Sequence, residues 1–222
     1  MAEISRPGEL CEQALRVDAE RNRIRLIEAA REVFSEQGLN ASMNEVARRA
    51  CVGVATLFRR FPTRDDLITA TFADKMTAYA DAIDDALADT DPWHGFCEYV
   101  ERVCAMQAGD RGFTDVLTLT FPAAKGFEAE RNRSARGFAE LVERAKATGR
   151  LREDFAHQDL AMMLMANAGV VTGMRDAAPD AWRRFVAYIL QAFAAESAQP
   201  LPEPPAPHQI YRALMRLQPK PD

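Results

Sequence analysis

The chain has 222 residues, 48% of which are hydrophobic, and a formal net charge of -5. This apolar content is enough to build a buried core, which excludes a chain that is disordered throughout. Helix-forming residues such as Ala, Leu, Glu and Arg dominate, whereas runs of alternating β-branched residues are missing. The composition therefore predicts an all-α protein.

The net charge is unevenly distributed along the chain. Residues 16–64 contain 10 Arg and no Lys against 6 acidic residues, a net charge of +4. The residues after Arg64 carry a net charge of -7. A basic segment on an otherwise acidic chain is typical of a DNA-binding domain attached to a larger body.

The sequence contains little that would indicate a targeting signal, a membrane span or a metal site. The N-terminus has no apolar signal run and no window is apolar over the length of a membrane span, so we expect a cytoplasmic protein with no membrane partner. The four cysteines form no CxxC pair, which fits a reducing compartment. His94 and Cys97 have helical ligand spacing and His157 could join them, but so few donors make a poor metal signature. We expect no metal and no cofactor.

Residues 1–17 are expected to form a flexible arm, because they show no clear hydrophobic period and contain Pro7. Such an arm is either disordered or reaches DNA. Asp18 is a candidate cap for a helix that runs to about Gln37. Three- and four-residue spacing predicts that one face of this helix is apolar, formed by Ile24, Ile27, Ala30 and Phe34.

Two short helices are predicted within residues 42–61. Ser42 and Glu45 form a capping-box pattern at the start of the first helix, and residues 51–53 form a turn before the second. This is the layout of a helix-turn-helix, whose second helix enters the DNA major groove. Any two short amphipathic helices would share the pattern, so spacing alone leaves a purely structural role open.

The second of these helices has two different faces. Val54, Leu57 and Phe61 share one face and can pack inward. Small, hydroxyl and basic side chains occupy the other face, at Ala55, Thr56, Arg59 and Arg60. Small residues let the backbone approach the groove, a hydroxyl can bind a phosphate, and arginine can bind a phosphate or a guanine edge.

A long helix is predicted next, over residues 64 to about 88, because Thr63 and Asp66 repeat the capping pattern after Pro62. The N-terminus of this helix, with Arg64, is a suitable seat for a phosphate.

Two dense motifs cover this region, IRLIEAAREVFSEQGLNASMNEVARRA at residues 24–50 and VGVATLFRRFPTRDDL at residues 52–67. With them, residues 20–70 resemble the TetR (tetracycline-repressor) family of one-component transcriptional repressors. The resemblance implies an N-terminal three-helix helix-turn-helix DNA-binding domain, at residues 18–66, joined to a larger helical ligand-binding and dimerisation domain, at residues 67–198.

The resemblance also assigns the residues at the DNA. These are Arg21, Arg23, Ser42, Met43, Val54, Ala55, Thr56, Phe58, Arg59, Arg60 and Arg64. Cys51 stands where glycine is common in the family, and Phe58 stands where tyrosine is usual. The loss of that tyrosine hydroxyl is expected to remove one phosphate hydrogen bond.

The rest of the chain is predicted to form further helices. Their approximate bounds are Trp93 to Ala108, Phe113 to Phe121, Glu128 to Thr148, His157 to Met174 and Pro179 to Ala195. A proline-rich tail follows at residues 199–222, with a short amphipathic piece at Ile210 to Leu217 that either docks on the body or is mobile.

The motif WxxFxxYV at residues 93–100 and the segment at residues 178–190 are similar to one class of TetR-family effector domains, the SbtR-like class. That similarity implies dimerisation through the last two helices and a small molecule held among the middle ones. The candidate pocket residues are aromatic or flexible: Trp93, Phe96, Tyr99, Val100, Val103, Phe113, Leu117, Phe121, Phe138, Met162, Met163 and Met174. Each of them could instead belong to a plain core. Because the set contains no charge cluster, we expect a neutral or apolar effector.

Two apolar stripes are candidates for the dimer interface. The first consists of Leu164, Ala168 and Val171, and the second consists of Trp182, Phe185, Val186, Ile189 and Phe193. A buried core within one protomer would produce the same stripes. Two-fold pairing would place two recognition helices about 34 Å apart, on the half-sites of a palindrome.

These patterns together predict a DNA-binding transcriptional regulator, a homodimeric repressor released from a palindromic operator by a small molecule. A second hypothesis is a DNA-binding protein whose body has no cavity and serves partner interaction. An enzyme has little support, since the chain lacks GxGxxG, GK[ST], GxSxG and HExxH motifs.

Overall fold

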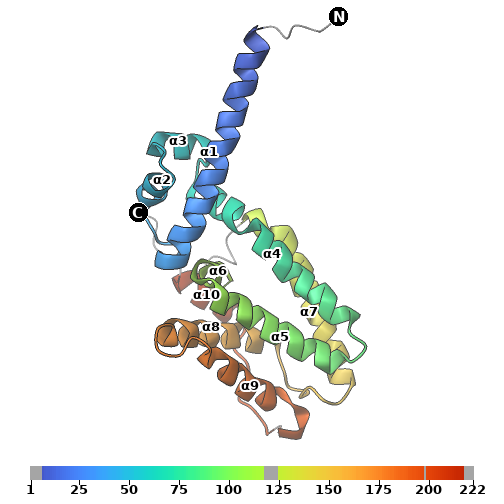
Figure 1. Cartoon of the computed structure of the whole chain (residues 1–222). Coiled ribbons are helices and arrows are strands. Elements are labelled where there is room, and N and C mark those ends of the chain that lie inside the picture. Colours follow the sequence, from blue (N-terminus) through green and yellow to red (C-terminus); the bar gives the residue numbers. More distant parts are fainter. Residues whose placement is uncertain (1–6, 118–124, 198, 218–222) are drawn as a thin grey trace, which may run out of the picture. The chain divides into compact units, whose positions relative to one another are not determined.

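The computed structural model describes residues 7–117, 125–197 and 199–217. These residues confirm the all-α prediction, because they contain helices and a single isolated bridge, between Leu151 and Ala194, but no strand. The chain divides into two compact units, Met1–Thr71 (the first unit) and Phe72–Asp222 (the second unit). Figure 1 shows the order of the helices along the chain.

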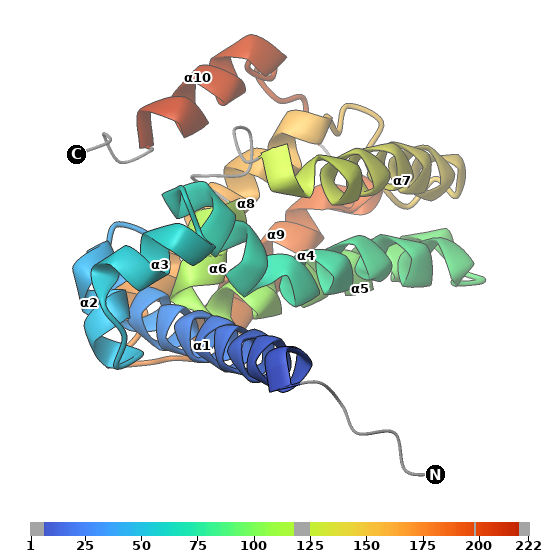
Figure 2. The same cartoon turned by 90° about the horizontal axis from the view of Figure 1, so that it is seen from above.

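The first unit contains α1, α2, α3 and the start of α4. Their bounds are Pro7–Gln37, Met43–Arg49, Val54–Arg60 and Arg64–Ala88. Figure 2 shows α2 and α3 beside α1, and both α1 with α2 and α2 with α3 are in contact.

Helix α1 is longer than its apolar periodicity predicts, because it begins at Pro7 and not near Asp18. Residues 8–17 are rich in strong helix formers, and proline is well suited to the first position of a helix. Propensity is therefore sufficient to extend the helix beyond its apolar face. Residues 1–6 of the expected arm lie outside the described residues.

The buried face of α1 differs from the expected one at two positions, Ile24 and Ile27, and Ile27 is half-buried. Leu26, Ala30 and Phe34 are fully buried, whereas Ile24 is 47% exposed. Apolar spacing alone therefore does not bury Ile24.

Helix α2 begins where its cap predicts, but only half of the capping box forms. The hydroxyl of Ser42 accepts a hydrogen bond from the backbone N–H of Asn44 at 3.2 Å. The carboxylate of Glu45 instead binds Arg48, at 2.6 and 2.8 Å. Arg49 donates two hydrogen bonds to Glu36 of α1, at 2.8 and 3.0 Å, and this guanidinium lowers the pKa of the Glu36 carboxyl.

The turn between α2 and α3 contains a residue in the left-handed region, Cys51, with a φ of 55°. A side chain at such a position is strained, which is the physical reason why glycine suits it better. We expect Cys51→Gly to raise the free energy of unfolding by about 1 kcal/mol. Urea denaturation followed by circular dichroism measures this gain, and Cys51→Ala, which keeps the Cβ, should show none. Equal effects of the two variants would disprove strain at Cys51.

Helix α4 has the complete reciprocal cap that its sequence predicts. The N–H of Asp66 donates to the hydroxyl of Thr63 at 3.1 Å, and the N–H of Thr63 donates to the Asp66 carboxylate at 2.9 Å. This cap defines the start of α4 at Arg64.

The second unit is built around α5, which contacts α6, α7, α8 and α9. The bounds of these helices are Pro92–Gly109 for α5, Arg111–Asp115 for α6, Glu128–Ala147 for α7, His157–Met174 for α8 and Ala181–Phe193 for α9. Short 3-10 turns lie at Lys125–Phe127 and Ala195–Ser197. These bounds agree with the sequence within two residues, except that α6 ends at Asp115 and not near Phe121. Residues 118–121 of its expected range lie outside the described residues.

An aromatic cluster fills the centre of the second unit. Phe96 of α5 is fully buried, and its ring lies 5.4 Å from Phe155, 6.1 Å from Phe138 and 6.3 Å from Phe193, between centroids. Trp93 stacks on the same ring at 5.7 Å. Such a cluster joins α5, α7 and α9 into one core.

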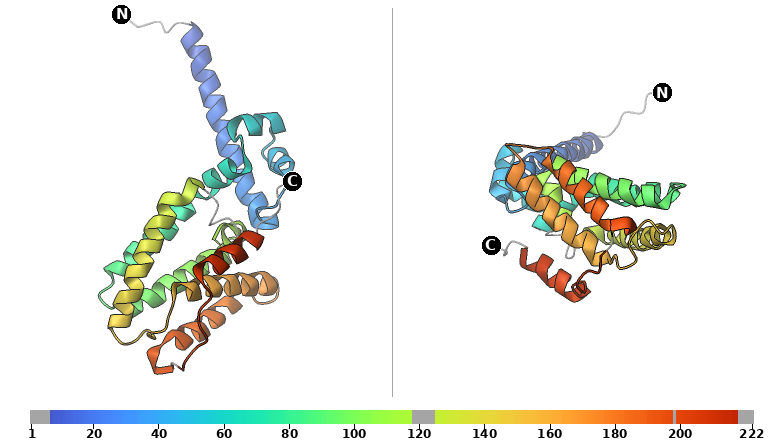
Figure 3. Two further views of the ribbon diagram at one scale, coloured as in Figure 1. Left: turned by 180° about the vertical axis from the view of Figure 1, so that it is seen from behind. Right: turned by 90° about the horizontal axis from the view of Figure 1, so that it is seen from below.

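The C-terminal segment docks on the second unit. The buried guanidinium of Arg152 donates to the carbonyl of Gln199 at 2.6 Å and to that of Ala192 at 3.1 Å, and it pairs with Asp154. Beyond the proline-rich stretch, α10 (Pro207–Leu217) contacts α8, as Figure 3 shows from behind. Of the two alternatives left open by the sequence, the described residues show docking.

None of the helices in the described ranges combines the length and hydropathy required to cross a bilayer.

Candidate functional site

The outer face of α3 presents the side chains that the sequence singles out. Val54 and Phe58 are 40% and 44% exposed, and Ala55, Arg59 and Arg60 are also exposed, while Thr56 is half-buried. Leu57 and Phe61 pack inward as expected. Val54 does not, which corrects its assignment to the inner face. Leu57 and Phe61, four residues apart, lie on the face of α3 that packs on the core, whereas the first turn of the helix lies at the surface.

A carboxylate of α1 lies among the arginines of this face. The Glu20 carboxylate accepts a hydrogen bond from Arg60 at 3.1 Å and lies 3.7 Å from the guanidinium of Arg23. The guanidinium of Arg21 lies 3.8 Å from the carboxylate of Asp18, one helical turn earlier in α1. These exposed pairs contribute little to stability, since water screens them. They hold basic side chains at the surface, where phosphate could replace the carboxylates.

Neutralising Glu20 should strengthen DNA binding. In Glu20→Gln the acceptor for Arg60 loses its charge, and the repulsion of a nearby phosphate disappears. We expect a dissociation constant for operator DNA about 3- to 10-fold lower at 0.1 M salt, measured by fluorescence anisotropy. Glu140→Gln, which removes a similar exposed ion pair from α7, should leave the constant unchanged. Weaker binding by Glu20→Gln would show that the carboxylate assists the arginines.

The remaining expected DNA contacts have structural partners. Ser42 caps α2, and Met43 beside it is buried. Arg64 is half-buried, and one of its nitrogens donates to the carbonyls of Leu39 and Ala41 at 2.8 and 2.7 Å. Arg64 therefore closes the loop between α1 and α2, and only its other donors could face a phosphate.

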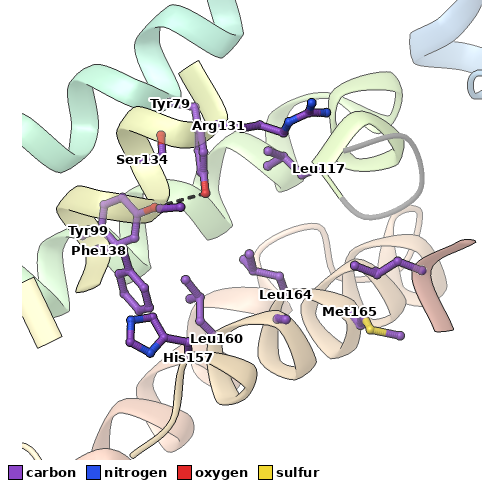
Figure 4. Close-up of a pocket in the computed structure, with 13 residues that line it drawn as sticks. Tyr79, Tyr99, Leu117, Arg131, Ser134, Phe138, His157, Leu160, Leu164 and Met165 are labelled. Carbon is purple, nitrogen blue, oxygen red and sulfur yellow. Dashed lines mark hydrogen bonds between the residues drawn. The ribbon is translucent and has the colours of Figure 1, made fainter. Parts of the chain in front are cut away.

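A cavity of about 250 Å³ lies in the second unit, between α4, α5 and α7 on one side and α8 and α10 on the other (Figure 4). Its lining residues are Tyr79, Tyr99, Leu117, Arg131, Ser134, Ala135, Phe138, His157, Leu160, Ala161, Leu164, Met165 and Leu214. The cavity is mostly apolar with a few hydrogen-bonding groups, which is the usual character of a small-molecule site.

The cavity includes only part of the pocket expected from the sequence. Tyr99, Leu117 and Phe138 line it. The structure places the others elsewhere: Trp93, Phe96, Val100, Val103 and Phe113 pack in the core or against it, Met163 is buried, and Met162 and Met174 are exposed. Phe121 lies outside the described residues. Aromatic character does not distinguish a cavity wall from a core, because both are apolar.

Several lining residues are absent from the sequence-based set. Arg131, Ser134 and Phe138 share one face of α7 through three-, four- and seven-residue spacing, and this signal was available in the sequence. Tyr79 and Leu214 come from α4 and α10. No local pattern marks those two, because their place in the cavity depends on how distant helices pack.

The expected dimer stripes largely face the interior of the protomer. Trp182, Val186 and Val171 are buried, and Phe193 belongs to the aromatic cluster. Leu164 lines the cavity. The other members of the set are half-buried: Ala168, Phe185 and Ile189. Contact between α8 and α9 within the protomer accounts for this burial.

Thiols and metal ligands do not form a second site in the described ranges. Burial raises the pKa of both Cys97 and Cys104 to about 12, so these thiols stay protonated and unreactive near neutral pH. The ring of His94 contacts the Asp89 carboxylate at 2.7 Å. Within these ranges, no three His, Cys, Asp or Glu residues converge on a point that could hold a metal ion.

Comparison with known proteins identifies the first unit. Residues 26–71 match the family described as bacterial regulatory proteins, tetR family. An HTH-type transcriptional regulator of Staphylococcus aureus (strain USA300) is 43% identical over 54 residues, which are 24% of this chain. The match spans only 29% of the length of that relative.

Solved structures share the fold of most of the chain. A TetR-family transcriptional regulator from Agrobacterium tumefaciens has a TM-score of 0.57 and 16% identity, with 80% of this chain and 100% of that chain covered. FadR from Bacillus subtilis, solved in complex with stearoyl-CoA, has a TM-score of 0.55 and 17% identity, with 79% and 99% covered. Residues 26–71 are therefore a helix-turn-helix segment of the tetR family of bacterial regulatory proteins, and most of the chain shares the all-α fold of solved TetR-family regulators.

Proposed function

We propose that the chain is a homodimeric repressor that leaves a palindromic operator when a small molecule occupies the cavity of the second unit. The observation that carries this proposal is the outer face of α3, where Arg59 and Arg60 are exposed beside small side chains. We assign DNA binding to residues 18–66 and effector binding and dimerisation to residues 67–198.

The DNA contacts follow from the chemistry of this face. Arg59 and Arg60 can bind phosphates or guanine edges, Thr56 can bind a phosphate, and Ala55 allows the backbone to approach the groove. Phe58 adds an exposed ring without a hydroxyl, which can contact a thymine methyl group. Residues 16–64, which include this face, carry a net charge of +4, and this favours association with DNA.

Dimerisation is assigned to the outer faces of α8 and α9. Both Gly169 and Gly173 of α8 have open space where a Cβ would lie, within the described residues. Met174 and Tyr188 are large exposed apolar side chains on α8 and α9. Small residues beside exposed apolar ones suit a helix–helix contact with a second copy of the chain, because they allow close approach and bury apolar surface.

Effector control is supported by the cavity, which distinguishes this proposal from a body that serves partner contacts alone. The structurally similar FadR was solved with stearoyl-CoA bound. A ligand that fits one conformation of the second unit better than another shifts the population of conformations, and this changes the affinity of the dimer for two half-sites. Such coupling requires no catalytic group, and we propose no enzymatic activity.

Selection of bound fragments from genomic DNA tests the proposal. The full chain is incubated with sheared DNA at 0.1 M salt, and the recovered fragments are sequenced. We expect a palindromic consensus, and we expect sedimentation of the chain at micromolar concentration as a dimer. Recovery of fragments without a shared sequence, or a consensus with a single half-site and a monomer, would overturn the proposed mode of binding.

A further inference from the structure

The cavity of the second unit has two chemically different walls. Figure 4 shows Tyr79, Tyr99, Ser134 and Arg131 on one side, and Leu160, Leu164 and Met165 of α8 on the other, with His157 at the first turn of α8 as the polar exception on that side. Leu214 of α10 completes the apolar side. A molecule that satisfies both walls must itself have a polar end and an apolar body.

The polar wall contains a hydroxyl that lacks a partner. Ser134 is only 2% exposed, and its Oγ makes no hydrogen bond to any described residue. A buried hydroxyl without a partner costs roughly 1–3 kcal/mol, and native structures seldom leave one unexplained. Rotation about a single side-chain bond redirects this hydroxyl, so a ligand oxygen in the cavity could bind it.

The same face of α7 supplies a positive charge. Arg131 precedes Ser134 by one helical turn and lines the cavity with it. Burial lowers the pKa of the Arg131 guanidinium, because removal from water disfavours the cation. The neighbouring carboxylates of Glu128 and Glu130 partly offset this effect. A ligand carboxylate in the cavity would favour the charged form further, and it matches the planar donors of arginine in geometry as well as in charge.

The size of the cavity limits the apolar body. Its volume of about 250 Å³ exceeds the roughly 150 Å³ that holds benzene and falls below the roughly 300–1,000 Å³ of drug-sized ligand sites. The space therefore fits a body of one or two rings, or an aliphatic chain of similar volume.

We propose that the effector is a compact apolar monocarboxylate, with its carboxylate against Arg131 and Ser134 of α7 and its apolar body against α8 and Leu214 of α10. This inference rests on the proposed effector role of the cavity. It replaces the neutral or apolar effector expected from the sequence, because Arg131 does not belong to the set of aromatic and flexible residues on which that expectation was based.

Matched probe pairs that differ in charge and not in shape test this inference. Isothermal titration calorimetry of the full chain compares benzoate with benzamide, 2-naphthoate with 2-naphthamide, and octanoate with octanamide. Hydrogen bonds to charged groups are about twice as strong as neutral ones. We therefore expect the carboxylate of the best-fitting pair to bind at least about tenfold more tightly than its amide.

Arg131→Met should abolish this preference while the amide binds as before, which shows that the cavity is still folded. Ser134→Ala should weaken the carboxylate by a smaller factor. Arg136→Met, on the exposed side of the same helix, is the matched control and should keep the full preference.

The failures are distinguishable. Equal binding of both members of every pair, or a preference that persists in Arg131→Met, overturns the monocarboxylate assignment and leaves the cavity as an effector site. No binding of any probe overturns both the assignment and the effector role. DNA binding in the absence of probes is measured separately and depends on neither.

Discussion

Replacement of Arg59 and Arg60 together by alanine should lower operator affinity by roughly 10²–10³-fold at physiological salt. Both side chains are exposed at the end of α3. The ion pair of Arg60 with Glu20 of α1 is exposed and therefore screened by solvent. Loss of the two arginine side chains should leave the fold intact, because α3 packs on the core through the buried side chain of Leu57. Binding is measured by fluorescence anisotropy on a fragment recovered by genomic selection.

Salt dependence separates the roles of the two arginines. Each phosphate contact that is lost reduces the slope of log affinity against log salt by about 0.9, whereas loss of a guanine contact relaxes specificity at one base pair. The control Arg136→Ala with Lys146→Ala removes the same charge from α7 and should change affinity less than twofold. Operator affinity that survives the α3 double variant would refute α3 as the recognition helix.

Gly95→Ala should destabilise the second unit by about 2–3 kcal/mol. Gly95 lies in the first turns of α5, and a Cβ there would overlap the carbonyl oxygen of Ala86 and lie 3.2 Å from the Cβ of Asp89. The obstacle is backbone near the end of α4, so no rotamer change can relieve it. Helix α5 would have to move away from α4, with loss of packing at the core.

The same substitution at two other glycines provides a graded series. At Gly137 of α7 the nearest atom is a side-chain carbon of Ile83, at 2.7 Å, and not a backbone atom as at Gly95. We expect an intermediate loss there. At Gly109, at the end of α5, an added Cβ meets no described atom within 4 Å, so the change should be within about 0.5 kcal/mol. Urea denaturation followed by circular dichroism should rank the variants in this order. A stable Gly95→Ala variant would contradict the close approach of α4 and α5.

Local signals in the sequence were sufficient for most helices. Thr63 with Asp66 defines the start of α4, and α8 has the expected bounds, His157–Met174. Such features depend on residues within one or two turns of each other, so periodicity and capping can predict them. Where propensity and apolar periodicity disagree, as in α1 before Asp18, periodicity alone placed the helix start too late.

Side-chain partners were less predictable than helix bounds. Glu45 was expected to complete the cap of Ser42 but binds Arg48, and Arg64 binds the carbonyls of Leu39 and Ala41. A charged side chain has several partners within reach, and the one it takes depends on the position of neighbouring helices. Sequence spacing cannot decide among them.

The sequence by itself determined the all-α class, the helix order and the DNA-reading motif, because each depends on short-range periodicity, capping and the spacing of basic residues. Only the tertiary structure decided which residues line the cavity, because α4, α5, α7, α8 and α10 contribute one side chain or a few each. It likewise decided that Trp182 and Val186 face the interior. An apolar stripe on a helix must be buried, but the sequence does not say which surface buries it. That surface depends on the packing of segments that lie far apart in the chain.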